Sequence, residues 1–176
     1  MKKPLLLAGL TAVSLLMNCA AKANIGDTLA QSNARYGEPW RHYSDADRSN
    51  LYFYITGGYL ILEFVSPSTG AVECIEYTKA QGAIDHNEVD GIMKENFPAY
   101  YLDSEHWRVE VDHRGQNSRD NAKVMVSVDN SYWLETGWDV QAGDGMNSYL
   151  SISTPVGWQE MMPLKNQADT NRKNNQ

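Results

Sequence analysis

Two glutamates stand where a pair of carboxyl groups could act together. Glu63 and Glu73 lie in two β-rich runs that a short polar loop joins. If Val65 pairs with Ala71, Glu63 faces Glu73 across the two strands, where neighbouring side chains lie close. Such a pair could serve as general acid and general base, as glycoside hydrolysis requires. The alternative is that these two like charges avoid each other, in water or at a bulge.

A second group of side chains could bind a partner rather than react. Side chains alternate along a β-strand, so tyrosines and isoleucines gather on one side of the predicted sheet. Tyrosine rings offer a broad contact area with one polar tip each. Such a surface suits a protein or a glycan, unless later strands cover it as a second core layer. The candidate partner-binding residues are Tyr52, Tyr54, Tyr59, Ile61 and Tyr77.

The histidines do not form a convincing metal site. His106 and His113 are seven residues apart, with Glu105 and Asp112 next to them. Along an extended strand, an odd spacing turns two side chains to opposite faces, so these histidines would not share a ligand. The sequence also lacks a glycine-rich phosphate loop, a serine-centred elbow and a CxxC pair. We therefore expect neither a metal nor a cofactor.

A hairpin at Gly57-Gly58 must position the tyrosines and Glu63. Two glycines between β-rich runs are typical of a two-residue turn, because glycine readily adopts positive φ. Pairing the strands about this turn sets Phe53 opposite Leu62 and brings six apolar residues to one face. We expect that apolar face to be the core. Its members are Leu51, Phe53, Ile55, Leu60, Leu62 and Phe64.

Two short helices are predicted beside the strands. Asp27 can cap a helix that runs through Arg35, and Gly37 suits its end. A helix this short needs a surface to pack on, and the apolar face of the hairpin is the obvious one. The stretch Asp85-His86-Asn87-Glu88 has the pattern of a capping box, and apolar residues follow it at helical spacing.

Further strands are predicted after the second helix. Residues 107–112 and 123–129 alternate strictly, residues 132–138 are aromatic, and residues 147–154 form a final strand. The order of helix, strands, helix, strands predicts an α+β fold, with antiparallel β-meanders and two short helices packed on one face. It also raises the alternative of two α-β-β-β halves.

The N-terminal residues are typical of a secretory signal peptide. Lysines precede an apolar run in residues 1–23, and the run is followed by a small-residue cleavage pattern. Cleavage between Ala23 and Asn24 leaves one predicted domain at residues 24–164. The polar residues 165–176 contain no sizeable apolar side chain, so we expect a disordered tail there.

Cys19 raises the alternative of a lipoprotein. A bacterial lipobox has a small residue before the acylated cysteine, and Asn18 stands there instead. We therefore expect an exported protein, periplasmic or secreted, without a lipid on Cys19. Cys74 is the one cysteine after the predicted signal, so it has no internal disulfide partner, and we expect it to be a small buried hydrophobe.

Charge and hydropathy argue against two kinds of partner. The formal net charge of the chain is −7, and no basic stripe is present. A chain of that sign repels phosphate backbones, so we expect no nucleic acid partner. After the predicted signal peptide, no hydrophobic run is long enough to span a membrane.

The first part of the predicted domain also resembles known exported domains. Ile25-Gly26-Asp27 opens a short helix, Arg35-Tyr36-Gly37-Glu38-Pro39 ends it, and a hairpin of the Leu60–Val65 kind follows. This order resembles the start of β-lactamase-inhibitor-protein-like and outer-membrane small-lipoprotein-like domains. It is also similar to uncharacterised exported bacterial proteins with a Tyr-Gly-x-Pro motif. The resemblance covers residues 25–78. It implies a two-layer α/β fold and a binding or scaffold role, with no catalytic residues.

Taken together, these patterns favour a non-enzymatic binding or envelope accessory domain that uses its tyrosine-bearing sheet face. The alternative is a periplasmic or secreted glycan-directed hydrolase with acidic catalytic residues. The expected partner is a protein or a glycan of unspecified identity.

Overall fold

The computed structural model describes most of the chain that follows the predicted signal peptide. The described residues are 24–43, 50–79, 81–112, 122–138, 147–161 and 163. The signal peptide, its cleavage after Ala23 and the tail at 165–176 fall outside these residues and stay predictions. Within the described ranges, no helix is long and apolar enough to cross a membrane.

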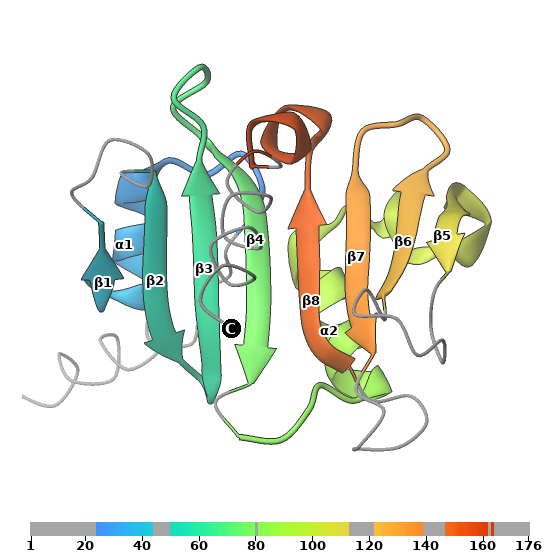
Figure 1. The fold of residues 1–176 in the computed structure, drawn as a ribbon, viewed down its shortest axis with the longest axis horizontal. Coiled ribbons are helices and arrows are strands. Elements are labelled where there is room, and N and C mark those ends of the chain that lie inside the picture. The colour runs from blue at the N-terminus through green and yellow to red at the C-terminus, as the bar shows by residue number, and fades with distance from the viewer. Residues whose placement is uncertain are drawn as a thin grey trace, which may run out of the picture.

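One antiparallel sheet of eight strands forms the centre of the described part of the chain, and α1 and α2 lie behind it in Figure 1. The strands are β1 (Arg41–His42), β2 (Leu51–Thr56), β3 (Tyr59–Val65), β4 (Val72–Lys79), β5 (Trp107–Asp112), β6 (Ala122–Ser127), β7 (Trp133–Trp138) and β8 (Asn147–Ser153). The helices are α1 (Leu29–Tyr36) and α2 (His86–Asn96), with 3₁₀ turns at Ala99–Leu102 and Ser104–His106. The predicted α+β class is confirmed.

The sheet consists of two halves that meet in its middle. Each half is a helix followed by a four-stranded meander, and the strand order is β1-β2-β3-β4-β8-β7-β6-β5. The last strands of the two meanders, β4 and β8, pair antiparallel from Cys74 opposite Ser153 to Thr78 opposite Tyr149. The first half therefore has one strand more than predicted, because β1 is only two residues long and leaves no alternating pattern.

The register predicted for the hairpin is confirmed. Thr56 lies opposite Tyr59, and Phe53 lies opposite Leu62. The turn needs its two glycines, since Gly57 has a φ of 58° and Gly58 a φ of 86°. Local turn chemistry and the alternation of side chains were enough to predict this pairing.

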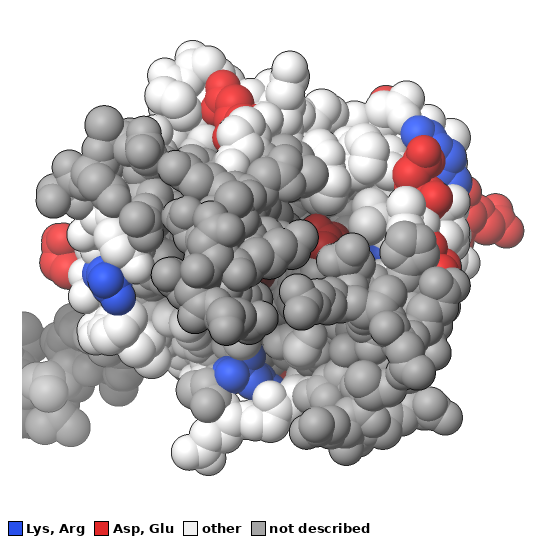
Figure 2. Space-filling model, viewed as in Figure 1, with Lys and Arg blue, Asp and Glu red and all other residues white. Residues whose placement is uncertain are grey.

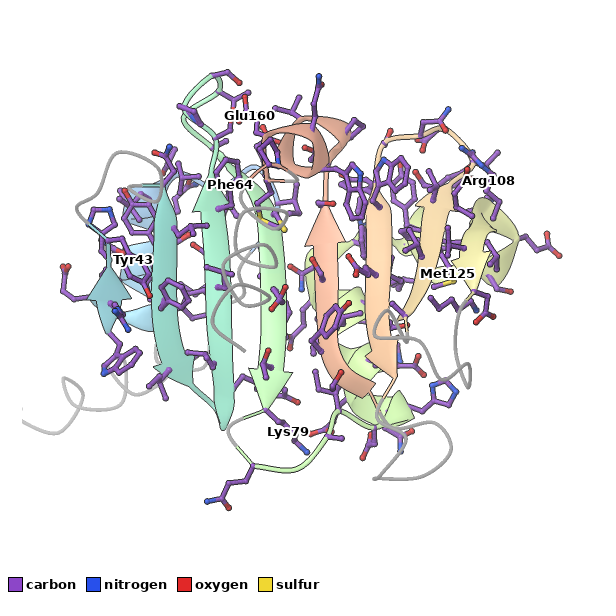
Figure 3. All side chains as sticks on the ribbon, in the orientation of Figure 1. Tyr43, Phe64, Lys79, Arg108, Met125 and Glu160 are labelled. Carbon is purple, nitrogen blue, oxygen red and sulfur yellow. The ribbon has the colours of Figure 1, made fainter. Side chains whose placement is uncertain are left out.

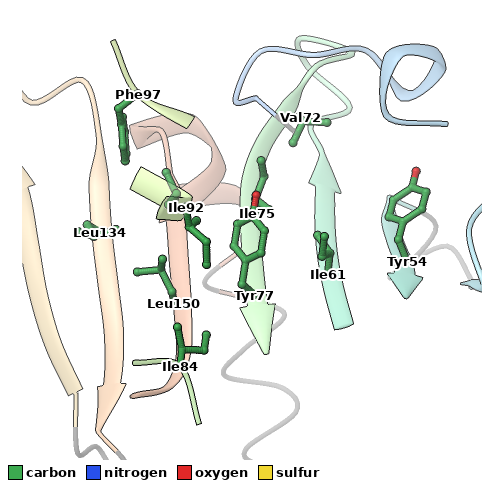
Figure 4. Packing of buried hydrophobic residues seen from close by; sticks show 11 residues of the cluster. Tyr54, Ile61, Val72, Ile75, Tyr77, Ile84, Ile92, Phe97, Leu134 and Leu150 are labelled. Atoms are coloured by element: carbon green, nitrogen blue, oxygen red, sulfur yellow. The ribbon is translucent and has the colours of Figure 1, made fainter. Parts of the chain in front are cut away.

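The face that forms the main core is the opposite of the one predicted. We call it the tyrosine face, after Tyr52, Tyr54, Tyr59, Ile61 and Tyr77. Tyr54, Ile61 and Tyr77 are buried there, side by side across three strands (Figure 4). The other half of the sheet and α2 extend the same apolar layer. They contribute Leu134, Leu150 and Ile152 from β7 and β8 and Ile92 from α2, and this layer continues from Ile75 of β4.

The hydroxyl groups of the buried tyrosines find hydrogen-bond partners on the two helices. The hydroxyl of Tyr54 donates to Asn33 Oδ1 of α1 at 2.9 Å. Asn96 Nδ2 of α2 donates to the hydroxyl of Tyr77 at 3.1 Å. A buried tyrosine whose hydroxyl is paired contributes a large apolar ring to the core without an unsatisfied polar group.

The other side of the sheet, here called the Glu76 face, carries Phe53, Leu62, Glu76, Val124, Trp133, Glu135, Tyr149 and Ser151. A helical segment, residues 155–161, packs on one end of it, where Met161 joins Leu51, Phe64 and Cys74 in a small buried cluster. Figure 3 shows Phe64 and Glu160 at this end of the sheet. Cys74 is buried, as predicted.

Two valines that the alternation places inward are exposed. The alternation of residues 107–112 places Val109 inward, and Val109 does lie opposite Met125 on the core side, but it is 53% exposed on the edge strand β5. The pairing of β5 with β6 is irregular after it, between Val109 and Val111. Such an irregularity turns the following side chains relative to the partner strand. Val128, also expected inward, lies beyond the end of β6 and is 55% exposed.

The start of α2 is at the predicted residue, whereas the start of α1 is one residue later than predicted. For α1, Thr28 caps the first turn with its side chain and Gln31 closes the capping box, so the predicted cap at Asp27 is one residue early. Asp27 instead forms an ion pair with Arg35 from the last turn of the same helix. For α2, the predicted capping box is confirmed, with Asp85 Oδ1 accepting from Glu88 N at 2.9 Å.

Replacement of Asp85 by alanine is expected to lower the free energy of unfolding by about 1 kcal/mol. The change removes the acceptor for Glu88 N and leaves that amide without its capping partner. Urea unfolding followed by tryptophan fluorescence measures the effect. Asp85→Asn, which keeps a capping oxygen, is the matched control and should retain most of the stability. Equal losses in both variants would contradict the capping role.

Candidate functional site

Glu63 is the most unusual ionisable residue in the described part of the chain. It lies on β3 on the tyrosine face, opposite Tyr52 of β2 and Ile75 of β4, and it is 0% exposed. Charged side chains are rarely buried to this degree unless they are paired. Glu63 sits beneath α1, in the core rather than in water, which the sequence alone had not indicated.

The carboxyl group of Glu63 lacks a well-formed hydrogen bond. Neither of its oxygens has a hydrogen-bond partner among the described residues, and the same holds for Ser32 Oγ of α1. Ser32 is the fully buried residue of α1, and its hydroxyl is near enough to lower the pKa of Glu63. The two polar groups therefore meet between helix and sheet without the geometry of a hydrogen bond.

Burial raises the pKa of Glu63 to about 7. The main cause is loss of hydration, which penalises the ionised form. The Asp27 carboxylate raises the pKa further, whereas Ser32 and the Arg35 guanidinium lower it. A carboxyl group with this pKa changes charge near neutrality, and such groups are concentrated at functional sites.

The tyrosines around Glu63 respond to the same environment. Burial raises the pKa of Tyr77 to about 12, with the charge of Glu63 as a smaller contribution and the hydrogen bond from Asn96 acting in the other direction. Burial and the charge of Glu63 also raise the pKa of Tyr54. Both hydroxyls therefore stay protonated near neutral pH.

The predicted pairing of Glu63 with Glu73 is wrong. Glu63 lies opposite Ile75, because the register of β3 and β4 shifts at a bulge that contains Glu73. The Glu73 carboxylate instead accepts hydrogen bonds from Thr69 Oγ1 at 2.8 Å and from Thr154 Oγ1. The two carboxyl groups do not face each other across the strands, so this register gives the acid–base hypothesis no support.

Three residues of the candidate partner-binding set lie in the core. Tyr54, Ile61 and Tyr77 are covered by the helices, so they cannot contact a partner in this conformation. The sequence hypothesis had considered cover from later strands. The cover comes instead from α1 and α2, because each helix begins a half of the fold and packs behind its own meander.

The other two candidate residues, Tyr52 and Tyr59, are half-buried, and each contacts a neighbouring side chain. The ring of Tyr52 stacks on that of His42, with the ring centroids 4.5 Å apart and 6° between the planes. The hydroxyl of Tyr59 donates to Glu88 Oε1 at 3.0 Å, and Glu88 also pairs with Lys79 at 2.7 Å. Tyr52 and Tyr59 are therefore already engaged in contacts within the fold, with His42 and Glu88.

The Glu76 face brings together residues that lie far apart in sequence. Glu76, Ser151 and Glu135 form a row across β4, β8 and β7, since Ser151 lies opposite both glutamates. The hydroxyl of Tyr149 donates to Glu135 Oε1 at 2.5 Å. Ser151 Oγ lies 3.6 Å from Cys74 Sγ. Sequence reasoning missed this row, because pairing of β4 with β8 is a long-range event that leaves no local pattern.

Apolar side chains flank that row on the same face. Phe53 and Leu62 lie on the β2 and β3 side, and both are half-buried. On the β7 side Trp133 is half-buried, and its ring stacks on that of Trp158 with the centroids 5.0 Å apart. Figure 2 views this face and shows acidic atoms near its middle. Among the described residues, no group of three or more metal-ligating side chains converges here or elsewhere.

The fold and this face together define an α+β domain with one long antiparallel sheet. No family model and no curated protein matches the sequence. Two solved structures are similar at 14% identity. A DUF4309 family protein (YjgB) from Bacillus subtilis subsp. subtilis str. 168 aligns over 72% of this chain and 78% of its own, with a TM-score of 0.39.

The second similar structure is an extracellular protein containing a SCP domain from Bacillus anthracis str. Ames. The match covers 79% of this chain but 47% of that protein, with a TM-score of 0.43. The present chain thus spans about half the length of that structure.

Proposed function

We propose that this protein is a non-enzymatic binding domain that holds a basic segment of a partner protein on the Glu76 face. The observation that carries this proposal is the charge of that face. At the two edges of this face, Arg41 of β1 lies opposite Phe53 and Arg108 of β5 lies opposite Val126. Between these edges, on β2, β3, β8, β7, β6 and the Cys74–Thr78 part of β4, the described side chains that point to the face include two charged ones, Glu76 and Glu135. Both are acidic.

The spacing of these two glutamates suits a cationic side chain. They lie on strands that flank β8, and neighbouring strands are about 4.8 Å apart, so their Cα atoms are separated by about 10 Å. A lysine or arginine side chain that approaches the face between the two glutamates would therefore contact both carboxylates. The formal net charge of −7 also attracts a basic partner over a longer range.

The apolar flanks supply the rest of such an interface. Phe53 and Leu62 lie on one side of the acidic row, and Trp133 and Val124 lie on the other. Interfaces typically combine buried aromatic or aliphatic anchors with a few directed polar contacts. A partner segment with a basic residue between apolar ones would match both parts of the face.

This proposal keeps the class of function expected from the sequence and moves the surface to the opposite side of the sheet. The predicted signal peptide would place the encounter in the periplasm or outside the cell. The proposal needs no catalytic step.

A library of short displayed peptides tests the proposal with a defined probe. We expect selection on the wild type to enrich peptides with lysine or arginine next to aromatic residues. The double variant E76Q/E135Q is expected to bind the selected peptides at least about 10-fold more weakly, equivalent to about 1.4 kcal/mol. Added salt should weaken wild-type binding as well, because part of the attraction is screened.

The matched control is the double variant E105Q/E110Q. It also removes two negative charges, but both carboxylates are exposed near the β5 edge of the sheet rather than on the acidic row. Affinity should change little in this variant. The proposal is wrong if no peptide is enriched, if acidic or uncharged peptides are enriched, or if both double variants lose affinity equally.

A further inference from the structure

The carboxyl group of Glu63, which α1 covers, can be protonated or ionised. These two forms need different hydrogen-bond partners. A protonated carboxyl group can donate one hydrogen bond and accept others, so it can pair with the Ser32 hydroxyl after a small rotation. An ionised carboxylate can only accept, and it must also be compensated for the loss of water. The two states therefore place different requirements on the helix above them.

The groups that face Glu63 give the ionised state little help. From α1 and the turn before it, Arg35 is already paired with Asp27, whose own charge opposes ionisation. From β2, the hydroxyl of Tyr54 donates to Asn33. Tyr52 lies directly opposite Glu63 on β2, and its ring stacks on that of His42.

The remaining titratable neighbours come from α1, β4 and α2. The hydroxyl of Tyr77 is paired with Asn96 and interacts with Tyr36 of α1. Glu95 of α2 acts on Tyr77 as a further negative charge. Ionised Glu63 would thus stand among phenol hydroxyls and other carboxylates, with Arg35 as the cation that reaches it.

The element above Glu63 is a short helix. A helix of eight residues is marginal in water and depends on packing. Its start is tied to the sheet through backbone hydrogen bonds, from Gly26 N to Val72 O at 2.8 Å and from Val72 N to Asp27 O at 2.7 Å. Along its length, the ring of Tyr36 packs against that of Tyr54 with the centroids 5.1 Å apart, Asn33 accepts from the Tyr54 hydroxyl, and Tyr36 interacts with the Tyr77 hydroxyl.

We propose that α1 is a proton-controlled cover of the sheet, seated while Glu63 is protonated and released from the sheet when Glu63 ionises. Release lets water reach the carboxylate and exposes Tyr54 and Ile61 of the tyrosine face. The tie between Gly26 and Val72 keeps the start of the helix attached, so the motion is an opening rather than a loss of the element. The protein thereby responds to a change of pH near neutrality.

Hydrogen–deuterium exchange of the whole protein tests this device. After correction for intrinsic exchange, protection of the α1 amides is expected to fall about 30-fold between about pH 5.5 and about pH 8.5. That factor follows from a pKa for Glu63 that changes from about 7 in the seated state to 4.5 when water reaches it. At the higher pH, α1 should also exchange faster than α2, which has no comparable carboxyl beneath it among the described residues.

Two variants distinguish the proton from other effects of pH. In E63Q the α1 protection should stay nearly constant over the same range, because the amide does not ionise. In E110Q, which removes an exposed carboxylate at the sheet edge, the 30-fold change should persist. An equal change in wild type and E63Q would overturn the proposal.

If E63Q does not fold, measurements on the wild type alone still test whether α1 opens when Glu63 ionises. The infrared carbonyl band of a protonated carboxylic acid should disappear over the pH range in which α1 loses protection. Equal exchange of α1 and α2 at both pH values would mean that α1 leaves only when the whole domain unfolds, and the proposal would be wrong. A carbonyl band that persists unchanged while α1 opens would also overturn it.

Discussion

Replacement of Glu63 by glutamine is expected to stabilise the protein by up to about 3 kcal/mol at about pH 8 and to change its stability little at about pH 4. The reason is the buried position of the carboxyl group, which has no hydrogen-bond partner among the described residues. Glutamine has nearly the same shape but cannot ionise, so it never carries the buried charge.

The direction of this effect follows from the two pKa values. In the unfolded chain Glu63 has its ordinary pKa of 4.5, whereas burial raises its pKa to about 7 in the folded protein. Between these values the folded state holds a proton that the unfolded state has lost, so the free energy of unfolding falls as the pH rises. The contribution is fully present below about pH 4.5 and is lost by about pH 7.

Urea unfolding at several pH values measures the prediction. The wild type should lose stability from about pH 4.5 to about pH 7 relative to E63Q, and the difference should then stay constant. E110Q serves as the control for the removal of one negative charge, since Glu110 is about half exposed at the sheet edge. Parallel pH profiles of wild type and E63Q would show that Glu63 titrates alike in both states.

Replacement of Phe97 by alanine is expected to lower the free energy of unfolding by about 3–5 kcal/mol, the largest loss we predict. Phe97 is 6% exposed and follows the end of α2. Its ring lies 5.0 Å from that of Tyr132, 5.4 Å from that of Trp107 and 6.0 Å from that of Tyr101, measured between centroids. Truncation leaves a cavity in the middle of this cluster.

The cluster also explains why the effect should spread through the second half of the fold. It joins the end of α2 to the 3₁₀ turn, to the first residue of β5 and to the residue before β7. Tyr100→Ala is the matched aromatic control, because Tyr100 is 51% exposed and stacks on His106 at the surface. Its expected loss is below about 1 kcal/mol. Equal losses in urea unfolding would contradict the central role of Phe97.

Several features could be read from short stretches of the chain. The hairpin register follows from Gly57-Gly58 and from alternation within ten residues on each side, and both are local properties. The start of α2 follows from Asp85 and Glu88, which are three residues apart. The class of fold follows from the order of these elements, because an amphipathic helix must pack on a sheet.

The choice of core face could not be read in this way. Within the hairpin, the face of Phe53 and Leu62 carries more apolar residues than the tyrosine face. Pairing of β4 with β8 adds Ile152 and Leu150 to the tyrosine face, and the helices then pack on that larger apolar layer. Residues of β8, about seventy positions after β4 in the sequence, therefore decide which face of the sheet forms the main core.

The neighbours of Glu63 depend on a bulge between β3 and β4 and on which face of the sheet forms the core. Without a bulge, the loop of residues 66–70 would set Glu63 opposite Glu73. The irregular pairing between Phe64 and Val65 shifts the partner to Ile75 and leaves Glu73 bonded to Thr69. Val65 also pairs with Val72 rather than with Ala71, so the longer loop and the bulge together shift the partner of Glu63 by two residues and separate the proposed catalytic pair.

The amino-acid sequence by itself determined most of the elements, the register of the β2–β3 hairpin and the class of fold, since these depend on side-chain period and turn chemistry over a few residues. Only the tertiary structure decided that α1 covers Glu63 and that Glu76 and Glu135 lie in one row. Both results depend on β4 meeting β8, and contacts between distant segments leave no periodic signal in either segment.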